Sequence, residues 1–211
     1  MPTAKICGLS TEATLDAAIA HGASHVGFVF FPKSPRDIDP AKAAALIRRV
    51  PPRVGAVGVF VDPDDALLDH AVAAGIGTIQ LHGHETPDRV AAVKARHGIP
   101  VWKAVPVRTR ADLATAHQYR QAADLILYDA KPPRGADLPG GMGLRFDWRL
   151  LQGHVHPLPW ALSGGLDAAS VGEAVQVTGA TLLDISSGVE LSPGVKDVDK
   201  IAAFLQSVAR S

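Results

Sequence analysis

Residues 25–60 read HVGFVFFPKSPRDIDPAKAAALIRRVPPRVGAVGVF, and the order of their segments decides the fold. Two apolar segments rich in β-branched residues, His25–Phe30 and Arg53–Phe60, flank an alanine-rich, helix-like stretch, Pro40–Arg49. Short continuous apolar runs are typical of strands that are buried on both faces of a parallel sheet. A strand, a helix and a second strand in this order predict one βαβ unit.

The same alternation continues along the whole chain. The predicted strands are Ala4–Cys7, His25–Phe30, Arg53–Phe60, Thr78–Leu81, Pro100–Val105, Leu125–Asp129, Trp160–Leu162 and Thr181–Ile185. The predicted helices are Thr11–His21, Pro40–Arg49, Asp64–Ala74, Thr86–His97, Arg110–Gln121, Asp167–Val177 and Val198–Ala209. Eight strands in sequence favour an α/β fold, a single-domain (β/α)8 TIM barrel over residues 1–211. An open doubly wound sheet is the alternative, although no Gly-x-Gly-x-x-Gly turn follows the first strand.

Composition excludes several functional classes. Lys plus Arg and Asp plus Glu number 21 each, so no global field attracts nucleic acid or an anionic membrane. One cysteine permits neither an intramolecular disulfide nor a cysteine-based zinc site. The first residues lack the apolar core of a signal peptide, and the longest apolar run, Val54–Val61, is too short to cross a bilayer. We expect a reduced, cytoplasmic protein.

Two glycine-containing turns follow the last two predicted strands. Ser163-Gly164-Gly165 precedes a helix that Asp167 is expected to cap, and Ser186-Ser187-Gly188 follows the neighbouring strand. Backbone N–H groups and a helix N-terminus at such a place can bind an anion, and phosphate sites after strands 7 and 8 recur in these barrels. Each turn alone could be merely a tight turn; the two together favour a phosphate site.

Cys7 and Lys5 are two residues apart on the first strand and therefore share a face. If that face is the barrel interior, Cys7 lies at the mouth, with Lys5 one layer deeper and able to stabilise a thiolate. A lone cysteine can also be a small buried hydrophobe.

Asp129 ends another apolar strand, where a carboxylate is destabilising unless it is hydrated, paired or functional. Its alternative role is to cap the turn that follows.

The long segment 130–146 follows Asp129 and contains Gly140-Gly141-Met142-Gly143. Loops of this length are usually functional or disordered, so we interpret the segment as a lid.

Arg36 follows two prolines. Its guanidinium could bind a carboxylate in bidentate fashion, or it could be a solvated surface residue. His82 and His84 lack the partners of a ligand set, so no metal is expected.

Several of these motifs resemble phosphoribosylanthranilate isomerases. The resemblance runs in order over essentially the whole chain. It rests on Lys5-Ile6-Cys7-Gly8, Gly27-Phe28-Val29-Phe30, Ser34-Pro35-Arg36, Gln80-Leu81-His82-Gly83, Gly140-Gly141-Met142-Gly143, Phe146-Asp147-Trp148, Leu162-Ser163-Gly164-Gly165-Leu166, Asp184-Ile185-Ser186-Ser187-Gly188-Val189-Glu190 and Ser192-Pro193-Gly194-Val195-Lys196-Asp197.

The resemblance implies a cofactor-free Amadori rearrangement of N-(5′-phosphoribosyl)anthranilate in tryptophan biosynthesis. We expect the protein to be a monomer or weak homodimer. It implies that Cys7 is the general base, Asp129 the general acid, and that Arg36 lies near the anthranilate carboxylate. Other substrate-binding positions that match are Lys5, His82, Gly141, Gly143, Gly164, Gly165, Asp184, Ser186, Ser187 and Gly188. Met142 and Leu191 depart from the pattern, which usually has a hydroxyl residue at the first position and a small polar residue at the second.

Two other functions remain in competition. The sister isomerase of histidine biosynthesis performs the same rearrangement on a larger bis-phosphorylated substrate, but it calls for an aspartate where Cys7 stands and for two similar half-barrels. A non-catalytic phosphosugar-binding barrel would keep the two glycine turns and need neither Cys7 nor Asp129.

Overall fold

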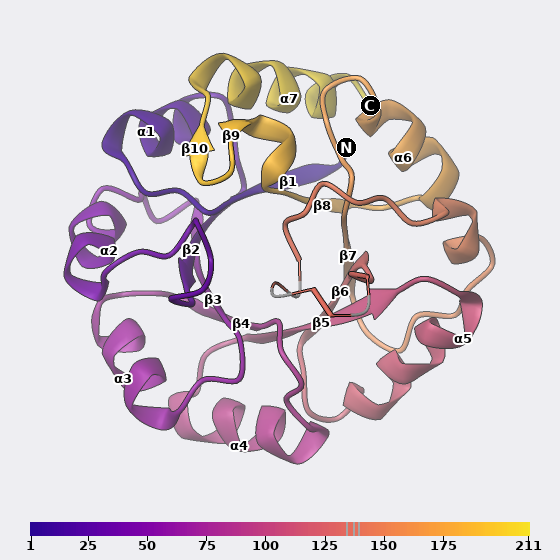
Figure 1. The fold of residues 1–211 in the computed structure, drawn as a ribbon, viewed down its shortest axis with the longest axis horizontal. Helices are drawn as coiled ribbons and strands as arrows, with labels where there is room; N and C mark the ends of the chain where they lie inside the picture. Colours follow the sequence, from indigo (N-terminus) through magenta and orange to yellow (C-terminus); the bar gives the residue numbers. More distant parts are fainter. Residues whose placement is uncertain (134, 137, 139) are drawn as a thin grey trace.

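Eight parallel strands close into a barrel in sequence order (Figure 1). The computed structural model describes residues 1–133, 135–136, 138 and 140–211. The strands are β1 (Thr3–Cys7), β2 (His25–Phe30), β3 (Gly55–Phe60), β4 (Thr78–Leu81), β5 (Val101–Val107), β6 (Leu125–Ala130), β7 (Trp160–Ser163) and β8 (Leu182–Ile185). Because β1 pairs with both β2 and β8, the predicted closed barrel is confirmed and the open-sheet alternative is wrong.

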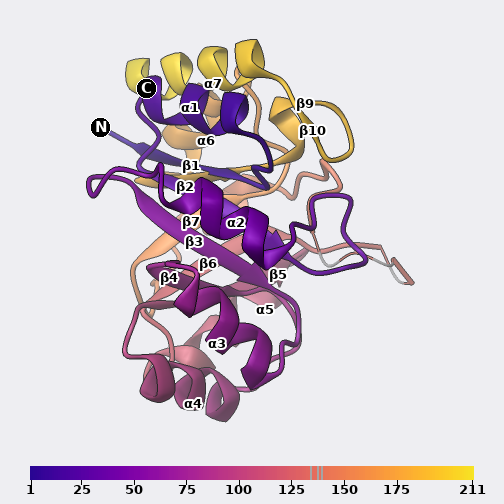
Figure 2. The ribbon, with the colours of Figure 1, turned by 90° about the vertical axis from the view of Figure 1, so that its left-hand side faces the viewer.

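Helices form the outer layer around the barrel (Figures 1 and 2). They are α1 (Glu12–Ala20), α2 (Pro40–Ile47), α3 (Asp65–Ala73), α4 (Pro87–His97), α5 (Arg110–Leu113), α6 (Val171–Thr178) and α7 (Val198–Arg210), with 3-10 helices η1 (Ala114–Tyr119), η2 (Trp148–Leu151) and η3 (Ser187–Val189). Side-chain oxygens of Thr11, Asp39, Asp64, Thr86 and Asp197 cap five of the helices. Within the described part of the chain, no helix is long and apolar enough to span a membrane.

Two predicted helices differ from the observed ones. The stretch Arg110–Gln121 is one turn of α-helix, α5, that continues as the 3-10 helix η1. The helix predicted to start at Asp167 begins at Val171, because the Asp167 carboxylate accepts from the N–H groups of Ala169 and Ser170 and so closes a separate turn first.

Alternate strand residues fill the barrel interior in layers. Val57, Trp102 and Leu127 belong to an apolar cluster inside the barrel, and Cys7, Val29 and Val59 form a second cluster. The remaining face of each strand packs outward under the helices.

A short hairpin that we did not predict follows η3. Its strands are β9 (Glu190–Ser192) and β10 (Val195–Lys196), paired antiparallel with an irregular register. Glu190 and Lys196, which are paired across the hairpin, are both buried. The hairpin thereby places two charged side chains beside the mouth of the barrel.

Candidate active site

One cavity lies at the carboxyl ends of the strands, the end where barrels of this type carry their chemistry. Its empty space, open solvent included, is about 840 Å³. Apolar side chains that follow or end β2 and β3 line one part, namely Val29, Phe31, Val59 and Val61. The glycine turns after β7 and β8 line another part. Every predicted site residue except Lys5 lines this cavity, and Lys5 lies below it.

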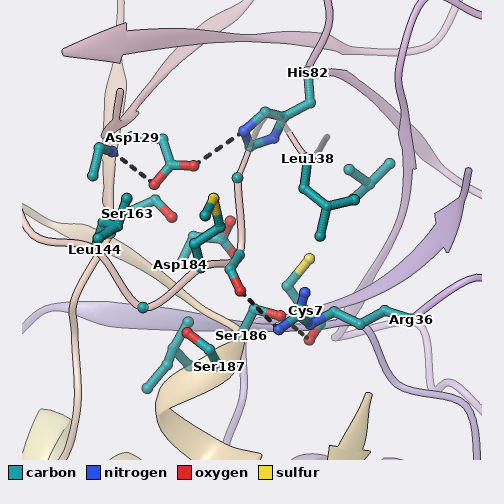
Figure 3. A pocket seen from close by; sticks show the side chains of 18 of the residues that line it. Cys7, Arg36, His82, Asp129, Leu138, Leu144, Ser163, Asp184, Ser186 and Ser187 are labelled. Atoms are coloured by element: carbon teal, nitrogen blue, oxygen red, sulfur yellow. Dashed lines mark hydrogen bonds and ion pairs between the residues drawn. The ribbon is translucent and has the colours of Figure 1, made fainter. Parts of the chain in front are cut away.

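Cys7 ends β1, and its thiol points into the cavity with 7 % of the residue exposed (Figure 3). Lys5 is fully buried two residues earlier and donates to the Asp184 carboxylate over 2.9 Å. Burial acts to lower the pKa of Lys5, but Asp184 and Cys7 raise it overall, so the side chain stays cationic. The predicted placement of Cys7 above Lys5 agrees with this geometry.

The expected stabilisation of a thiolate by Lys5 does not lower the pKa of Cys7 overall. Burial raises the pKa of Cys7 above its ordinary value, because desolvation of the thiolate outweighs the opposing charges of Lys5 and Lys196. The nearby Asp184 carboxylate acts in the same direction as burial. Cys7 is therefore a thiol at neutral pH and becomes a strong base once it is ionised.

Asp129 lies across the cavity from Cys7, near the end of β6 (Figure 3). One carboxylate oxygen, Oδ1, accepts from the Ala130 backbone N–H over 2.9 Å. The other, Oδ2, lies 3.1 Å from Nε2 of His82. The far nitrogen of that ring, Nδ1, lies 3.1 Å from Nε2 of Gln80. We did not predict Gln80 as a site residue, although its place two residues before His82 puts it on the same strand face.

The guanidinium of Arg36 is held by the protein itself. Its Nε and Nη2 donate to the two carboxylate oxygens of Glu190, each over 2.8 Å, and Nη2 also donates to the Gly141 carbonyl over 2.9 Å. Lys196 donates to the same carboxylate over 2.6 Å. Burial acts to raise the pKa of Glu190, but Arg36 and Lys196 lower it below its ordinary value. Glu190 and Lys196 were not predicted as site residues, although both lie within motifs of the family resemblance.

The two glycine turns lie side by side at the cavity wall. Gly164 and Gly165 have φ angles of +89° and +67°, a conformation that side chains other than glycine rarely adopt. Gly188 is close to the Leu166 carbonyl, where a Cβ atom would clash. In the same turn, the Ser186 hydroxyl donates to the Cys7 carbonyl over 3.2 Å. Backbone N–H groups in such turns can receive an anion.

The loop between β6 and η2 contributes its described residues to the cavity wall. Leu138, Met142 and Leu144 line the cavity, and Met142 is 46 % exposed. Gly141 lies next to the Arg36 guanidinium, and Gly143 lies near the Ser187 hydroxyl. Residues 134, 137 and 139, which belong to the predicted lid, lie outside the described residues.

Cys7, His82, Asp129 and Asp184 line the cavity, but in the described part of the chain they are not grouped as the ligands of a metal ion. Across the described ranges, no group of three or more His, Cys, Asp or Glu side chains could hold a metal ion. The His84 side chain is 94 % exposed and contacts only Asp62 among the ionisable groups described.

Comparison with known proteins identifies a family that matches nearly the whole chain. The family model described as N-(5′-phosphoribosyl)anthranilate (PRA) isomerase matches residues 4–207. An N-(5′-phosphoribosyl)anthranilate isomerase of Zymomonas mobilis is 58 % identical over 205 residues, which cover 97 % of this chain and 96 % of the relative.

Solved structures agree with this match. A phosphoribosyl anthranilate isomerase from Thermotoga maritima superposes with a TM-score of 0.90 at 36 % identity, and both chains are covered completely. A phosphoribosyl anthranilate isomerase in complex with reduced 1-(o-carboxyphenylamino)-1-deoxyribulose 5-phosphate superposes with a TM-score of 0.87 at 35 % identity, again over both complete chains.

Proposed function

The chain belongs to the N-(5′-phosphoribosyl)anthranilate isomerase family, and we propose that Cys7 and Asp129 are the general base and general acid of its reaction. The enzyme converts N-(5′-phosphoribosyl)anthranilate to 1-(2-carboxyphenylamino)-1-deoxyribulose 5-phosphate in L-tryptophan biosynthesis. The assignment of the two residues rests on one observation: their side chains point into a single cavity from opposite sides (Figure 3).

The rearrangement needs one acid and one base. Asp129 gives its proton to the ribose ring oxygen, the C1′–O bond breaks, and the anilino nitrogen forms an iminium with C1′. Cys7, as a thiolate, then removes the C2′ proton and produces an enolamine. This intermediate takes up a proton at C1′ and loses the 2′-hydroxyl proton, which gives the ketone with no net change in protons. Each general catalyst contributes a factor of about 10²–10⁴.

The raised pKa of Cys7 is compatible with this role. A less acidic thiol forms less thiolate at neutral pH, but that thiolate is a stronger base toward a carbon acid. Lys5 keeps its charge one layer below, where it stabilises the thiolate that forms during turnover. The Lys5–Asp184 pair therefore acts from beneath the sugar.

Cavity geometry supports one orientation of the substrate. The glycine turns after β7 and β8 suit the phosphate, since they offer backbone N–H groups. The anthranilate ring then lies across the barrel among Val29, Phe31 and Val59, with its carboxylate beside Arg36. Nε and Nη2 of Arg36 already donate to Glu190, so the N–H groups of Nη1 are the ones that would donate to the substrate carboxylate. The loop that carries Met142 closes over the sugar as a lid.

We further propose that residues 1–211 act as one barrel domain in the cytoplasm, as a monomer or weak homodimer. A phosphorylated substrate does not cross a bilayer unaided, so the enzyme must share a compartment with its supply. Leu191 and Val195 are exposed on the β9–β10 hairpin and offer a small apolar surface for self-association.

The assignment of Cys7 and Asp129 can be tested by following the loss of substrate fluorescence. The measurements are made under single-turnover and steady-state conditions, with a chelator present and no nucleotide. Wild-type protein should convert the substrate, whereas Asp129→Asn should bind it equally well and turn over about 10²–10⁴-fold more slowly. Cys7→Ser should show a similar loss. Turnover of a bis-phosphorylated aminoaldose alone would instead favour the histidine-pathway enzyme, and binding without turnover would favour a phosphosugar-binding barrel.

A further inference from the structure

Gln80 is a buried amide in the wall of the active site whose hydrogen bonding is incomplete. It lies on β4 with no exposed surface, and its Nε2 is 3.1 Å from Nδ1 of His82. Its Oε1 is also buried and, among the residues that the structure describes, has no hydrogen-bond partner. An unpaired buried oxygen is destabilising and requires an explanation.

The Gln80–His82 and His82–Asp129 distances permit two arrangements of hydrogen atoms in this series of three side chains. If Gln80 Nε2 donates to Nδ1, the ring carries its proton on Nε2 and donates to an ionised Asp129. If the amide is turned by 180°, Oε1 accepts from Nδ1–H. Nε2 of the ring then accepts from a protonated Asp129. The first arrangement belongs to the acid after it has delivered its proton, and the second to the acid before delivery.

The amide can turn at little cost. In each orientation one of its two ends faces Nδ1 and the other remains without a described partner, so the number of hydrogen bonds is unchanged. An amide is also the side chain that offers a donor and an acceptor at nearly the same position. A carboxylate or a thioether at position 80 would lack one or both of these functions.

We propose that Gln80 is a positioning residue that turns its amide with the protonation of the Asp129–His82 pair, accepting from His82 while the acid holds its proton and donating to His82 after the proton has left. The proposal rests on the proposed role of Asp129 as the general acid. Between the two states, the imidazole loses the Nδ1 proton to water and takes up a proton from water at Nε2, so the ring itself stays neutral.

Other charged groups surround the pair without contacting the imidazole ring in the described part of the chain. Cys7, Arg36 and Asp184 line the same cavity from β1, the loop after β2, and β8. Behind the end of β4, Lys103 donates to the Gly83 carbonyl over 2.8 Å and pairs with Glu85. The Lys103–Glu85 pair is internally neutralised, which leaves Gln80 as the described partner of Nδ1.

Long-range ¹⁵N–¹H spectra of the histidine rings, recorded without substrate across a pH series, test the proposal directly. In wild-type protein, the ring of His82 should be neutral with its proton on Nδ1 at low pH, which the ¹⁵N shift of a bare Nε2 distinguishes from an imidazolium, and it should change to the Nε2–H tautomer at high pH. In Gln80→Glu, Nδ1 should keep its proton throughout, because a carboxylate beside it accepts and does not donate. A His82→Gln spectrum assigns the signal.

Kinetics supply the second readout. Gln80→Glu should lower kcat about tenfold and leave KM within about twofold, because an ionised Asp129 would then face the bare Nε2 of the ring. Gln80→Met, which carries no charge, should also lower kcat and should remove the ordered change of tautomer. Thr78→Val, on the same strand face one layer deeper and outside the cavity, should match wild type in both readouts.

A single His82 tautomer at every pH in wild-type protein, or a doubly protonated ring at low pH, would overturn the proposal, as would a Gln80→Glu protein whose tautomer changes as in wild type. If Gln80→Glu does not fold, the wild-type and Gln80→Met spectra still decide. A wild-type protein that shows the tautomer change but does not turn over phosphoribosylanthranilate would contradict the proposed function and leave the amide switch standing.

Discussion

Lys5 and Asp184 form a 2.9 Å ion pair inside the barrel, although 179 positions separate them in the chain. They are register partners of β1 and β8, so the pair forms only when the last strand closes on the first. Both side chains are buried, and each is the described counter-charge of the other. A buried charge that loses its partner is strongly destabilising.

Lys5→Met should therefore lower the free energy of unfolding by about 3–5 kcal/mol, because Asp184 would remain buried without its partner. Urea unfolding at pH 7 measures the change. The double variant Lys5→Met/Asp184→Leu should recover most of the loss, since neither charge then remains. Lys131→Met, which breaks the more exposed pair of Lys131 with Asp112, should cost no more than about 1 kcal/mol. A Lys5→Met loss no larger than the Lys131→Met loss would refute the argument.

Cys7 should be alkylated in the native protein by a small reagent, at one site and with loss of activity. The thiol lines the cavity, so product or a substrate analogue should slow the modification. Because burial raises the thiol pKa above its ordinary value, the alkylation rate should still be rising above pH ~8.5.

Mass spectrometry and residual activity follow the reaction, and Cys7→Ser is the control, since it leaves the reagent no thiol. Native protein that resists the reagent, or that is alkylated with activity intact, would remove Cys7 from the mechanism. A rate that levels off well below pH 8.5 would instead show that Lys5 and Lys196 outweigh burial.

Arg36→Met should act mainly on KM, because a contact with the anthranilate carboxylate stabilises ground and transition states about equally. We expect KM to increase about 10- to 100-fold and kcat to stay within a few-fold of wild type, because one charge-assisted contact is lost. Steady-state kinetics measure both constants.

Glu190→Gln is the companion variant, since the amide keeps the shape but leaves Arg36 and Lys196 without their shared counter-charge. It should perturb KM less than Arg36→Met does. A pure kcat effect of Arg36→Met would contradict the proposed carboxylate contact.

The barrel could be predicted from sequence because its signals are local. Continuous apolar runs such as His25–Phe30 and Thr78–Leu81 match the observed strands, and strand alternation placed Cys7 above Lys5. The Arg36–Glu190 pair could not be predicted in this way, since 154 positions separate the residues and the unforeseen hairpin brings them together. The direction of the Cys7 pKa shift could not be predicted either, because it depends on how deeply the thiol is buried in the closed barrel.

His156 should make stability depend on pH far from the active site. The ring stacks on Trp160, with 4.4 Å between centroids, and its Nδ1 lies 3.3 Å from the Tyr128 hydroxyl. Burial, and to a lesser degree His154, lowers the pKa of His156 from 6.5 to about 4. The unfolded chain therefore binds a proton between these two values that the folded chain does not.

The contribution of His156 to the free energy of unfolding is therefore fully present above pH 6.5 and is lost as the pH falls toward 4. For one proton, the slope is at most about 1.4 kcal/mol per pH unit. Urea unfolding of wild type and of His156→Phe at pH 7 and pH 5 measures the difference. The phenylalanine keeps the stack on Trp160 but cannot be protonated, so its stability should fall less between the two pH values. His84→Gln, at a ring that is almost fully exposed, is the matched control and should follow wild type. Equal losses in wild type and His156→Phe would show that His156 is not the group responsible. Because the segment before β7 lies at the end of the barrel opposite the cavity, His156→Phe should leave kcat and KM unchanged.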